Sequence, residues 1–178
     1  MILAKVCLLG EISVGKTSLI RRFVDRTFSD SYLSTVGVTI SRKLIQTPAS
    51  LGVSAGEVQL ICWDLQGGHD FGAIASSYLK GAHAAVVVGD LTRNDTLEAL
   101  GEHIDRFMSI NPSGIVVVAL NKADLHSDPN PKPAIDSVNL QAILKTFGTS
   151  AKTGEGVDEL FTILATHLQQ RVEHGSAH

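Results

Sequence analysis

Hydrophobic residues occur in this chain as short unbroken runs, which are separated by longer stretches where apolar and polar residues alternate. The clearest runs are Ile2 to Leu9, Ala84 to Val88 and Ile115 to Leu120. Runs without alternation are typical of strands that are covered on both faces, as in a parallel sheet. We therefore expect strands at residues 2–9, 37–46, 57–64, 84–90, 114–120 and 146–150.

The stretches between these runs carry helical patterns. In the last one, apolar residues recur at helical spacing and polar residues occupy the other face: Val157, Leu160, Phe161, Leu164 and Leu168. Helices are expected over residues 16–26, 70–80, 94–110, 134–144 and 155–172. Alternating strands and helices with right-handed crossovers predict an α/β fold, a three-layer sandwich with a six-stranded, mostly parallel sheet and helices on both faces.

Composition and charge narrow the function classes. The chain has 178 residues, of which 44% are hydrophobic and 19% charged, so we expect one domain over residues 1–173 and a short polar tail at 174–178. The net charge is −3, whereas nucleic-acid-binding proteins usually present a basic surface, so we do not expect nucleic acid as a partner. Apolar runs are too short to span a bilayer, which predicts a cytoplasmic protein. Cys7 and Cys62 lie inside apolar runs and are expected to be small buried hydrophobes.

A glycine-rich segment directly follows the first apolar run. Gly10-Glu-Ile-Ser-Val-Gly15-Lys16-Thr17 has the spacing of a phosphate-binding loop between a strand and a helix. Such a loop directs backbone N–H groups and the positive end of the helix dipole at a polyphosphate. Lys16 adds a full charge for the β and γ phosphates, and the Thr17 hydroxyl can bind Mg²⁺. The alternative is a chance match, which the order of strand, loop and helix signals disfavours.

A second segment indicates the base. Asn121-Lys122-Ala123-Asp124 follows another apolar run, and the Asp124 carboxylate can accept hydrogen bonds from the ring N–H and the exocyclic amine of guanine. Two such bonds would discriminate against adenine by about 3 to 6 kcal/mol. Taken alone, the same string fits an ordinary helix cap equally well. After a phosphate-binding loop, it predicts a guanine nucleotide, GTP or GDP, with Mg²⁺.

The polar loops fall where a doubly wound sheet collects its ligands. Residues 10–17, 64–68, 121–124 and 150–152 all follow predicted strands of the sheet. The carboxyl ends of parallel strands meet at one edge of a sheet. We therefore expect one crevice that is built from all four loops.

Three further segments complete a family pattern: Trp63-Asp64-Leu-Gln-Gly67, the segment Thr149-Ser150-Ala151-Lys152-Thr-Gly-Glu-Gly-Val-Asp-Glu-Leu-Phe161, and Ser34-Thr35-Val36-Gly37. With them, the chain resembles a small GTPase of the Ras superfamily, nearest the Rab branch, from about Ala4 to Leu168. The resemblance implies a Ras-like G domain with the P-loop NTPase fold. It also implies a signalling switch that alternates between GTP-bound and GDP-bound forms. The Ras-like proteins of prokaryotes are among the GTPases that the chain could resemble.

The resemblance also implies roles for individual residues. It places Phe28 against one face of the guanine, the Lys122 stem against the other, and the Ala151 N–H at the guanine carbonyl. It makes Thr17, Thr35 and Asp64 the Mg²⁺ site. It makes Lys16, Thr35, Gly67 and Gly68 the catalytic positions. The full implied nucleotide site is Glu11, Ile12, Ser13, Val14, Gly15, Lys16, Thr17, Ser18, Phe28, Tyr32, Thr35, Gly67, Asn121, Lys122, Asp124, Leu125, Ser150, Ala151 and Lys152. Effectors and regulators would bind a monomer through residues 29–40 and 65–80.

Two departures from the family bear on hydrolysis. Gly68 stands where the family has the glutamine that orients the attacking water. Without this glutamine, the activation barrier of hydrolysis is expected to be about 1.5 to 3 kcal/mol higher. Ile12 replaces a small residue and could obstruct an arginine from a partner. Gln66 and His69 flank the gap as candidate surrogates, although His69 also fits a solvated loop residue. We expect slow hydrolysis unless a partner supplies the missing group.

Two functional hypotheses remain. In the first, the protein is a hydrolysing switch, and in the second it is a GTP-bound interaction module that hardly hydrolyses. The C-terminal residues 171–178 contain no cysteine for prenylation. Either the sequence is truncated or the protein works without a lipid anchor, and we expect the second.

Overall fold

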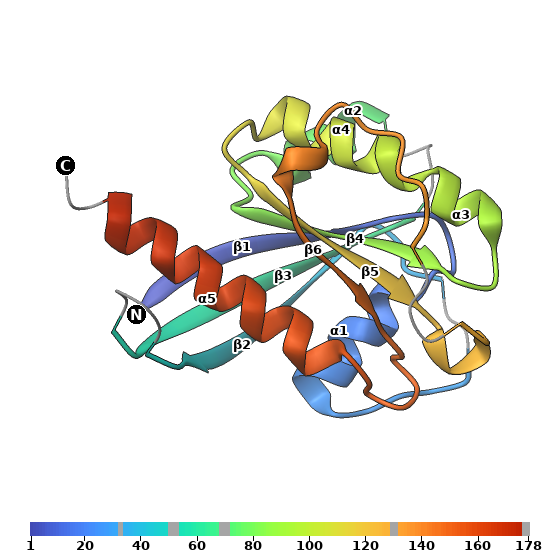
Figure 1. The fold of residues 1–178 in the computed structure, drawn as a ribbon, viewed down its shortest axis with the longest axis horizontal. Helices are drawn as coiled ribbons and strands as arrows, with labels where there is room; N and C mark the ends of the chain where they lie inside the picture. Colours follow the sequence, from blue (N-terminus) through green and yellow to red (C-terminus); the bar gives the residue numbers. More distant parts are fainter. Residues whose placement is uncertain (32–33, 50–53, 68–71, 129–131, 176–178) are drawn as a thin grey trace.

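The computed structural model describes residues 1–31, 34–49, 54–67, 72–128 and 132–175. In these ranges, six strands form one sheet: β1 Ile2–Leu9, β2 Val38–Thr47, β3 Gly56–Leu65, β4 Ala84–Asp90, β5 Ile115–Asn121 and β6 Ile143–Gly148. The strand order is β2-β3-β1-β4-β5-β6 (Figure 1). β2 and β3 are antiparallel, and every other neighbouring pair is parallel.

Helices cover both faces of this sheet: α1 Lys16–Asp25, α2 Gly72–Leu79, α3 Asn94–Glu98, α4 Leu100–Ile110 and α5 Val157–Gly175. Figure 1 shows α1 and α5 on one face and α2, α3 and α4 on the other. A separate hydrophobic core lies on each side of the sheet. On the first side, the rings of Phe23 and Phe161 stack with their centroids 4.0 Å apart and join α1 to α5. The predicted fold class, a three-layer α/β sandwich, is confirmed.

The unbroken apolar runs correspond to the central strands. Every residue of β4 and β5 is buried, because these strands lie between two helical layers. Cys7 and Cys62 are buried and unbridged, as predicted. Burial raises the pKa of each thiol to about 12, so both remain protonated.

The helix expected at 134–144 is wrong. A short 3₁₀ turn, Leu140–Ala142, leads into β6, which begins at Ile143 and not at residue 146. The preceding chain passes directly over α4, where a Cβ atom built on Gly101 would lie 1.7 Å from the carbonyl oxygen of Asp136. The backbone around Asp136 thus packs against the backbone of α4 at Gly101, and this segment does not form a helix.

Polar bonds hold this segment in place. The Asp105 carboxylate on α4 accepts hydrogen bonds from Ser137 Oγ and Asn139 Nδ2, both at 2.7 Å. These bonds lower the pKa of Asp105 and keep it charged. The helix expected at 94–110 also differs, because it divides at Ala99 into α3 and α4.

The connection between β2 and β3 is anchored by α5. The strands pair as far as Thr47 and Gly56. The buried side chain of Gln169 accepts a hydrogen bond from Thr47 Oγ1 and donates one to the carbonyl of Ser54 at 2.9 Å. α5 therefore holds both ends of this hairpin connection. Within the described residues, none of the helices has the length and apolar character that crossing a bilayer requires.

Candidate functional site

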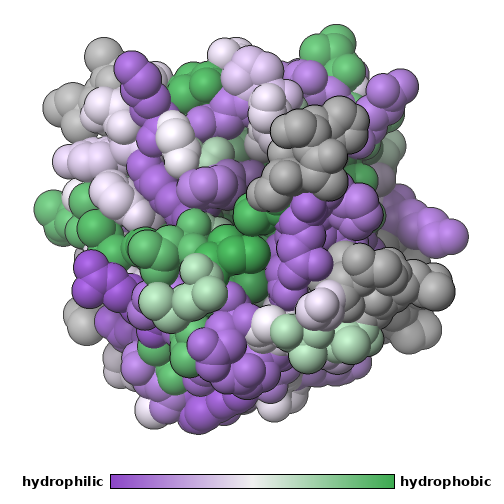
Figure 2. Space-filling model, turned by 90° about the vertical axis from the view of Figure 1, so that its left-hand side faces the viewer, coloured by the Kyte–Doolittle hydropathy of each residue, from purple (hydrophilic) through white to green (hydrophobic). Residues whose placement is uncertain are grey.

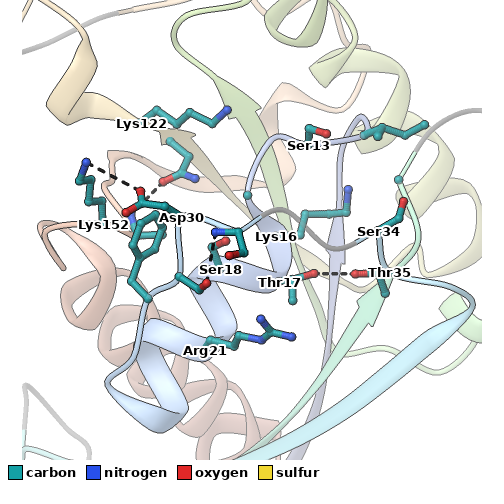
Figure 3. A pocket seen from close by; sticks show the side chains of 18 of the residues that line it. Ser13, Lys16, Thr17, Ser18, Arg21, Asp30, Ser34, Thr35, Lys122 and Lys152 are labelled. Carbon is teal, nitrogen blue, oxygen red and sulfur yellow. Dashed lines mark hydrogen bonds and ion pairs between the residues drawn. The ribbon is translucent and has the colours of Figure 1, made fainter.

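A cavity of about 300 Å³ opens at the carboxyl edge of the sheet (Figure 3). It is lined from the turn after β1, the start of α1, the chain that leads to β2, and the loops after β3, β5 and β6. The lining residues are Ile12, Ser13, Gly15, Lys16, Thr17, Ser18, Arg21, Phe28, Ser29, Asp30, Ser31, Ser34, Thr35, Leu65, Gln66, Gly67, Asn121, Lys122, Asp124, Leu125, Ala151 and Lys152. The loops that the sequence predicted to converge do form one cavity.

Two glycines shape the turn between β1 and α1. Gly10 has a φ of 140°, and a Cβ atom there would lie 2.3 Å from the carbonyl oxygen of Val88. Gly15 has a φ of 102°, and a Cβ atom there would lie 2.2 Å from Asn121 Nδ2. Any side chain would therefore clash at both positions, in addition to the backbone strain. Helix α1 begins at the next residue, Lys16, so its first N–H groups face the cavity edge.

Lys16 is buried against the backbone of this turn. Its Nζ donates hydrogen bonds to the carbonyl oxygens of Gly10 and Glu11, both at 2.8 Å. Burial lowers the pKa of Lys16 to about 8, although Asp64 and Glu11 oppose this shift. A Cβ atom on Gly67 would lie 2.6 Å from both Lys16 Nζ and the Glu11 carbonyl oxygen. Only glycine permits the loop after β3 to approach the ammonium so closely.

Two hydroxyls and a carboxylate meet beside Lys16. Thr17 Oγ1 lies 2.7 Å from Thr35 Oγ1 and donates to Asp64 Oδ2 at 2.5 Å; Figure 3 shows the two threonines facing each other. Asp64 Oδ1 is buried and has no hydrogen-bond partner among the described residues. Burial raises the pKa of Asp64, against the effect of Thr17 and Lys16. Oxygen donors with an unsatisfied buried carboxylate atom fit Mg²⁺, which prefers oxygen ligands and retains waters.

Asn121 joins three loops at the other end of the cavity. Its Nδ2 donates to the carbonyl of Val14 at 2.9 Å, and its Oδ1 accepts from the N–H of Ala151 at 3.2 Å. Nearby, Asp124 Oδ1 accepts a hydrogen bond from Ser150 Oγ at 2.6 Å. The Asp124 carboxylate is thus oriented by the loop after β6, and Asp124 lines the cavity.

Lys122 is held by a residue that the sequence analysis missed. Its Nζ lies 2.6 Å from Oδ2 of Asp90, a fully buried carboxylate at the end of β4. The hydroxyl and N–H of Thr92 donate to Asp90 Oδ1 at 2.7 and 2.9 Å. Burial alone raises the pKa of Asp90, but the bonds from Lys122 and Thr92 outweigh it and the pKa is lowered. Asp90 could have been found from the sequence, because it is an aspartate at the end of an apolar run that predicts a strand.

Not all of the predicted nucleotide contacts line the cavity. Glu11, Val14 and Ser150 support the lining residues and are not part of the lining itself. The Glu11 side chain lies against α4, where its Oε1 is 2.9 Å from His103 Nε2. Tyr32, Gly68 and His69 lie outside the described residues.

Seven lining residues were absent from the predicted nucleotide contacts: Arg21, Ser29, Asp30, Ser31, Ser34, Leu65 and Gln66. Arg21 follows Thr17 by one helical turn, so helical periodicity could have identified it. Phe28 lines the cavity and also packs on the core beneath α1. At the same end, Lys152 Nζ lies 3.9 Å from Asp30 Oδ1.

Comparison with known proteins agrees with this geometry. The model of the Ras family matches residues 5–170. Over 180 residues, the chain is 33% identical to the Ras-related protein Rab-1C of Dictyostelium discoideum, which covers 94% of this chain and 82% of that relative. It is 31% identical over 172 residues to the Ras-related proteins Rab-19 of Mus musculus and Rattus norvegicus. Each of these alignments covers 95% of this chain and 76% of the relative.

Proposed function

The chain belongs to the Ras family and is a GTP-binding small GTPase with Rab relatives, and from this premise we propose that it is a Mg²⁺-dependent switch with slow hydrolysis. The observation that carries the proposal is the meeting of Lys16, Thr17, Thr35 and Gly67 at one end of a single cavity, with the buried Asp64 bonded to Thr17 behind them. The guanine-recognition loops form the other end.

We assign binding of the phosphates to the turn from Gly10 to Thr17. Its backbone N–H groups and the start of α1 supply partial positive charge, and Lys16 supplies a full charge at the β and γ phosphates. The carbonyls that now hold Lys16 Nζ leave one further donor of the ammonium available, because this group has three. A phosphate oxygen would thus accept a third hydrogen bond from Lys16 Nζ, and the two bonds to the carbonyls would remain.

We assign base recognition to Asp124, Ala151 and Phe28, with the stem of Lys122 opposite Phe28. Stacking of a base on an aromatic ring contributes about 1 to 3 kcal/mol. Asp124 is oriented by Ser150 and accepts the two donors of guanine. The pairing of Lys122 with the buried Asp90 supports this arrangement, because it restricts the lysine stem to one path beside the cavity.

Thr17, Thr35 and Asp64 would hold Mg²⁺, which neutralises phosphate charge when bound. Thr35 lies in the chain before β2 and reaches Thr17 of α1 through one hydrogen bond. A bond between a loop and a fixed helix is the kind of contact that a terminal phosphate can strengthen. This supports residues 29–40 as a segment whose order depends on the nucleotide.

Slow hydrolysis is supported by the residue types at positions 68 and 12. Gly67 brings the loop after β3 close to Lys16, but the next residue, Gly68, cannot orient water by a side chain. Ile12 lines the cavity with about half of its side chain exposed (51%). Its bulk at the cavity mouth also supports the second candidate function, a GTP-bound interaction module, because it would impede an arginine from a partner.

Partner binding is supported by exposed apolar residues on the uncovered part of the sheet. Leu3 and Leu44 pair with the same residue of β3, Gln59, and both are about half exposed (54% and 46%). Figure 2 shows a band of hydrophobic surface on the side with the N-terminus and the β2–β3 hairpin. Val36 and Ile40 extend the apolar exposure towards the cavity. We propose that effectors and regulators bind there and at residues 65–80.

The test is to identify the nucleotide that copurifies and to follow its single-turnover hydrolysis with Mg²⁺, for wild type and Gly68→Gln. We expect GDP or GTP, slow hydrolysis in wild type, and acceleration by about ten- to a hundredfold in the variant. Rapid hydrolysis in wild type with no effect of the variant would contradict the assignment of Gly68. Binding without hydrolysis in either protein would favour the interaction module.

A further inference from the structure

Arg93 reaches the phosphate-binding turn from a fixed position between β4 and α3. Its Nη1 donates to the carbonyl oxygen of Ile12 at 2.9 Å. The Arg93 backbone is held by a bond from its N–H to the Asp90 carbonyl at 2.9 Å and by a bond from Thr96 Oγ1 to its own carbonyl at 2.8 Å. Arg93 does not line the cavity. The guanidinium therefore holds one peptide of the turn from outside the cavity.

The contact with Ile12 determines where the next N–H group points. A trans peptide is planar, so the carbonyl of Ile12 and the N–H of Ser13 point in opposite directions, and none of the described peptide bonds is cis. Ile12 and Ser13 both line the cavity. Because the carbonyl faces Arg93, which lies outside the lining, the Ser13 N–H faces the cavity.

The backbone at this point needs such a support. Ser13 has a φ of 65°, in the left-handed region that residues with a Cβ atom rarely adopt. The carbonyls of Gly10 and Glu11 are held by Lys16, and that of Ile12 by Arg93. Two cations thus fix three successive carbonyl groups of the turn. Without Arg93, the peptide before Ser13 could rotate and relieve the strain.

The other bond of the guanidinium contributes little. Arg93 Nη2 lies 2.8 Å from Asp95 Oδ2, and the two side chains are 39% and 66% exposed. Exposed ion pairs of this kind have little effect on stability. The contact with Ile12 is therefore the one through which Arg93 can affect the site.

We propose that Arg93 is a positioning residue for phosphoryl transfer, which holds the Ile12–Ser13 peptide so that the Ser13 N–H donates to the terminal phosphates. The inference rests on the proposed GTP hydrolysis. A donor that is already aimed at developing charge stabilises the transition state without reorganisation. In a site where Gly68 offers no side chain, such a backbone donor carries a larger share of the stabilisation.

The first experiment measures single-turnover GTP hydrolysis and GDP affinity for wild type, Arg93→Ala and Arg93→Lys. We expect Arg93→Ala to slow hydrolysis about tenfold and to change GDP affinity by less than about twofold, because misplaced groups affect the transition state most. The lysine variant should retain an intermediate rate. The matched control is Arg171→Ala. Arg171 also donates to a backbone carbonyl, that of Ser113 at 2.6 Å, but neither residue belongs to the phosphate-binding turn or lines the cavity. Its rate should equal that of wild type.

The second experiment is a double-mutant cycle with Ser13→Gly. Glycine adopts positive φ without strain, so Arg93→Ala should slow hydrolysis less than about threefold when residue 13 is glycine. Equal losses in both backgrounds would overturn the inference, as would an unchanged rate in Arg93→Ala or parallel losses of rate and GDP affinity.

Failure of the proposed hydrolysis has a different signature. In that case wild type binds GTP and does not hydrolyse it. Arg93 is then tested by binding of GDP with aluminium fluoride, which mimics the transferring phosphoryl group. Weaker binding of this complex by Arg93→Ala, with GDP affinity retained, supports the inference, and equal binding overturns it.

Discussion

The side-chain amide of Asn121 donates a hydrogen bond to the backbone carbonyl of Val14 at 2.9 Å, although the two residues are 107 positions apart. The same side chain accepts from the N–H of Ala151. One buried amide thus joins the turn after β1 to the loop after β6. It therefore connects the end of the cavity that we assign to the phosphates with the end that we assign to the base.

Replacing Asn121 by alanine should therefore loosen both ends of the site. The variant leaves the buried Val14 carbonyl and Ala151 N–H without their partner, which should cost about 2 to 3 kcal/mol of unfolding free energy. Release of bound GDP should become at least about tenfold faster. Denaturant unfolding and exchange of a fluorescent GDP analogue measure the two effects. The exposed Asn94→Ala serves as control, and equal behaviour of the two variants would contradict the linking role.

Asp90→Asn should weaken nucleotide binding without a direct contact to the nucleotide. The change removes the charge that holds Lys122, and a hydrogen bond to a charged group contributes about 1.5 to 3 kcal/mol. GDP affinity, measured by calorimetry, should decrease about tenfold or more. Asp158→Asn is the matched control, because Asp158 pairs with Arg26 on the surface with both side chains 57% exposed. If both variants bind GDP like wild type, the pairing of Lys122 with Asp90 has no part in binding.

Gly101→Ala should destabilise the fold by about 1 to 3 kcal/mol, as overpacking does. The new methyl group would meet the carbonyl of Asp136 at 1.7 Å, so the segment that crosses α4 must move. Thermal unfolding measures the loss. Gly148→Ala offers a control in a strand, because nothing lies within 4 Å of a Cβ atom there. A loss at Gly148 as large as at Gly101 would show that the crossing contact is unimportant.

His167 on α5 should make stability depend on pH. Burial, together with the nearby Arg171, lowers the pKa of His167 below its ordinary value of 6.5. The unfolded chain then takes up the proton first, so the stabilisation is complete above pH 6.5 and is lost as the pH falls below it. Melting temperatures of wild type should decrease between about pH 7 and 5, and His167→Gln should reduce this slope. An unchanged slope would exclude His167 as its source.

Much of the fold was predictable because its signals are local. The unbroken runs at β4 and β5 indicate strands between two layers, and the structure buries every residue of both. The residues that lead from β1 into α1 carry their own chemistry, since Gly10 and Gly15 occupy positions where a side chain would clash. Loops that follow parallel strands meet at one edge, so their convergence could also be predicted.

The segment at 134–144 shows where local signals are insufficient. Its spacing of apolar residues resembles a helix, yet Val138 is 92% exposed in the structure. The backbone crosses α4 at Gly101 and is bound by Asp105 instead. Both residues lie more than 30 positions earlier in the chain, so their effect is absent from the pattern of the segment itself.

The sequence by itself determined the six strands and most of the helices, and it predicted a phosphate-binding turn and a guanine-recognition segment, because each of these depends on neighbouring residues and backbone geometry. Only the tertiary structure decided which side chains support them. Asp90 holds Lys122 and Arg93 holds the carbonyl of Ile12 through contacts between distant segments. Such contacts depend on how layers pack in space, and periodicity along the chain does not encode them.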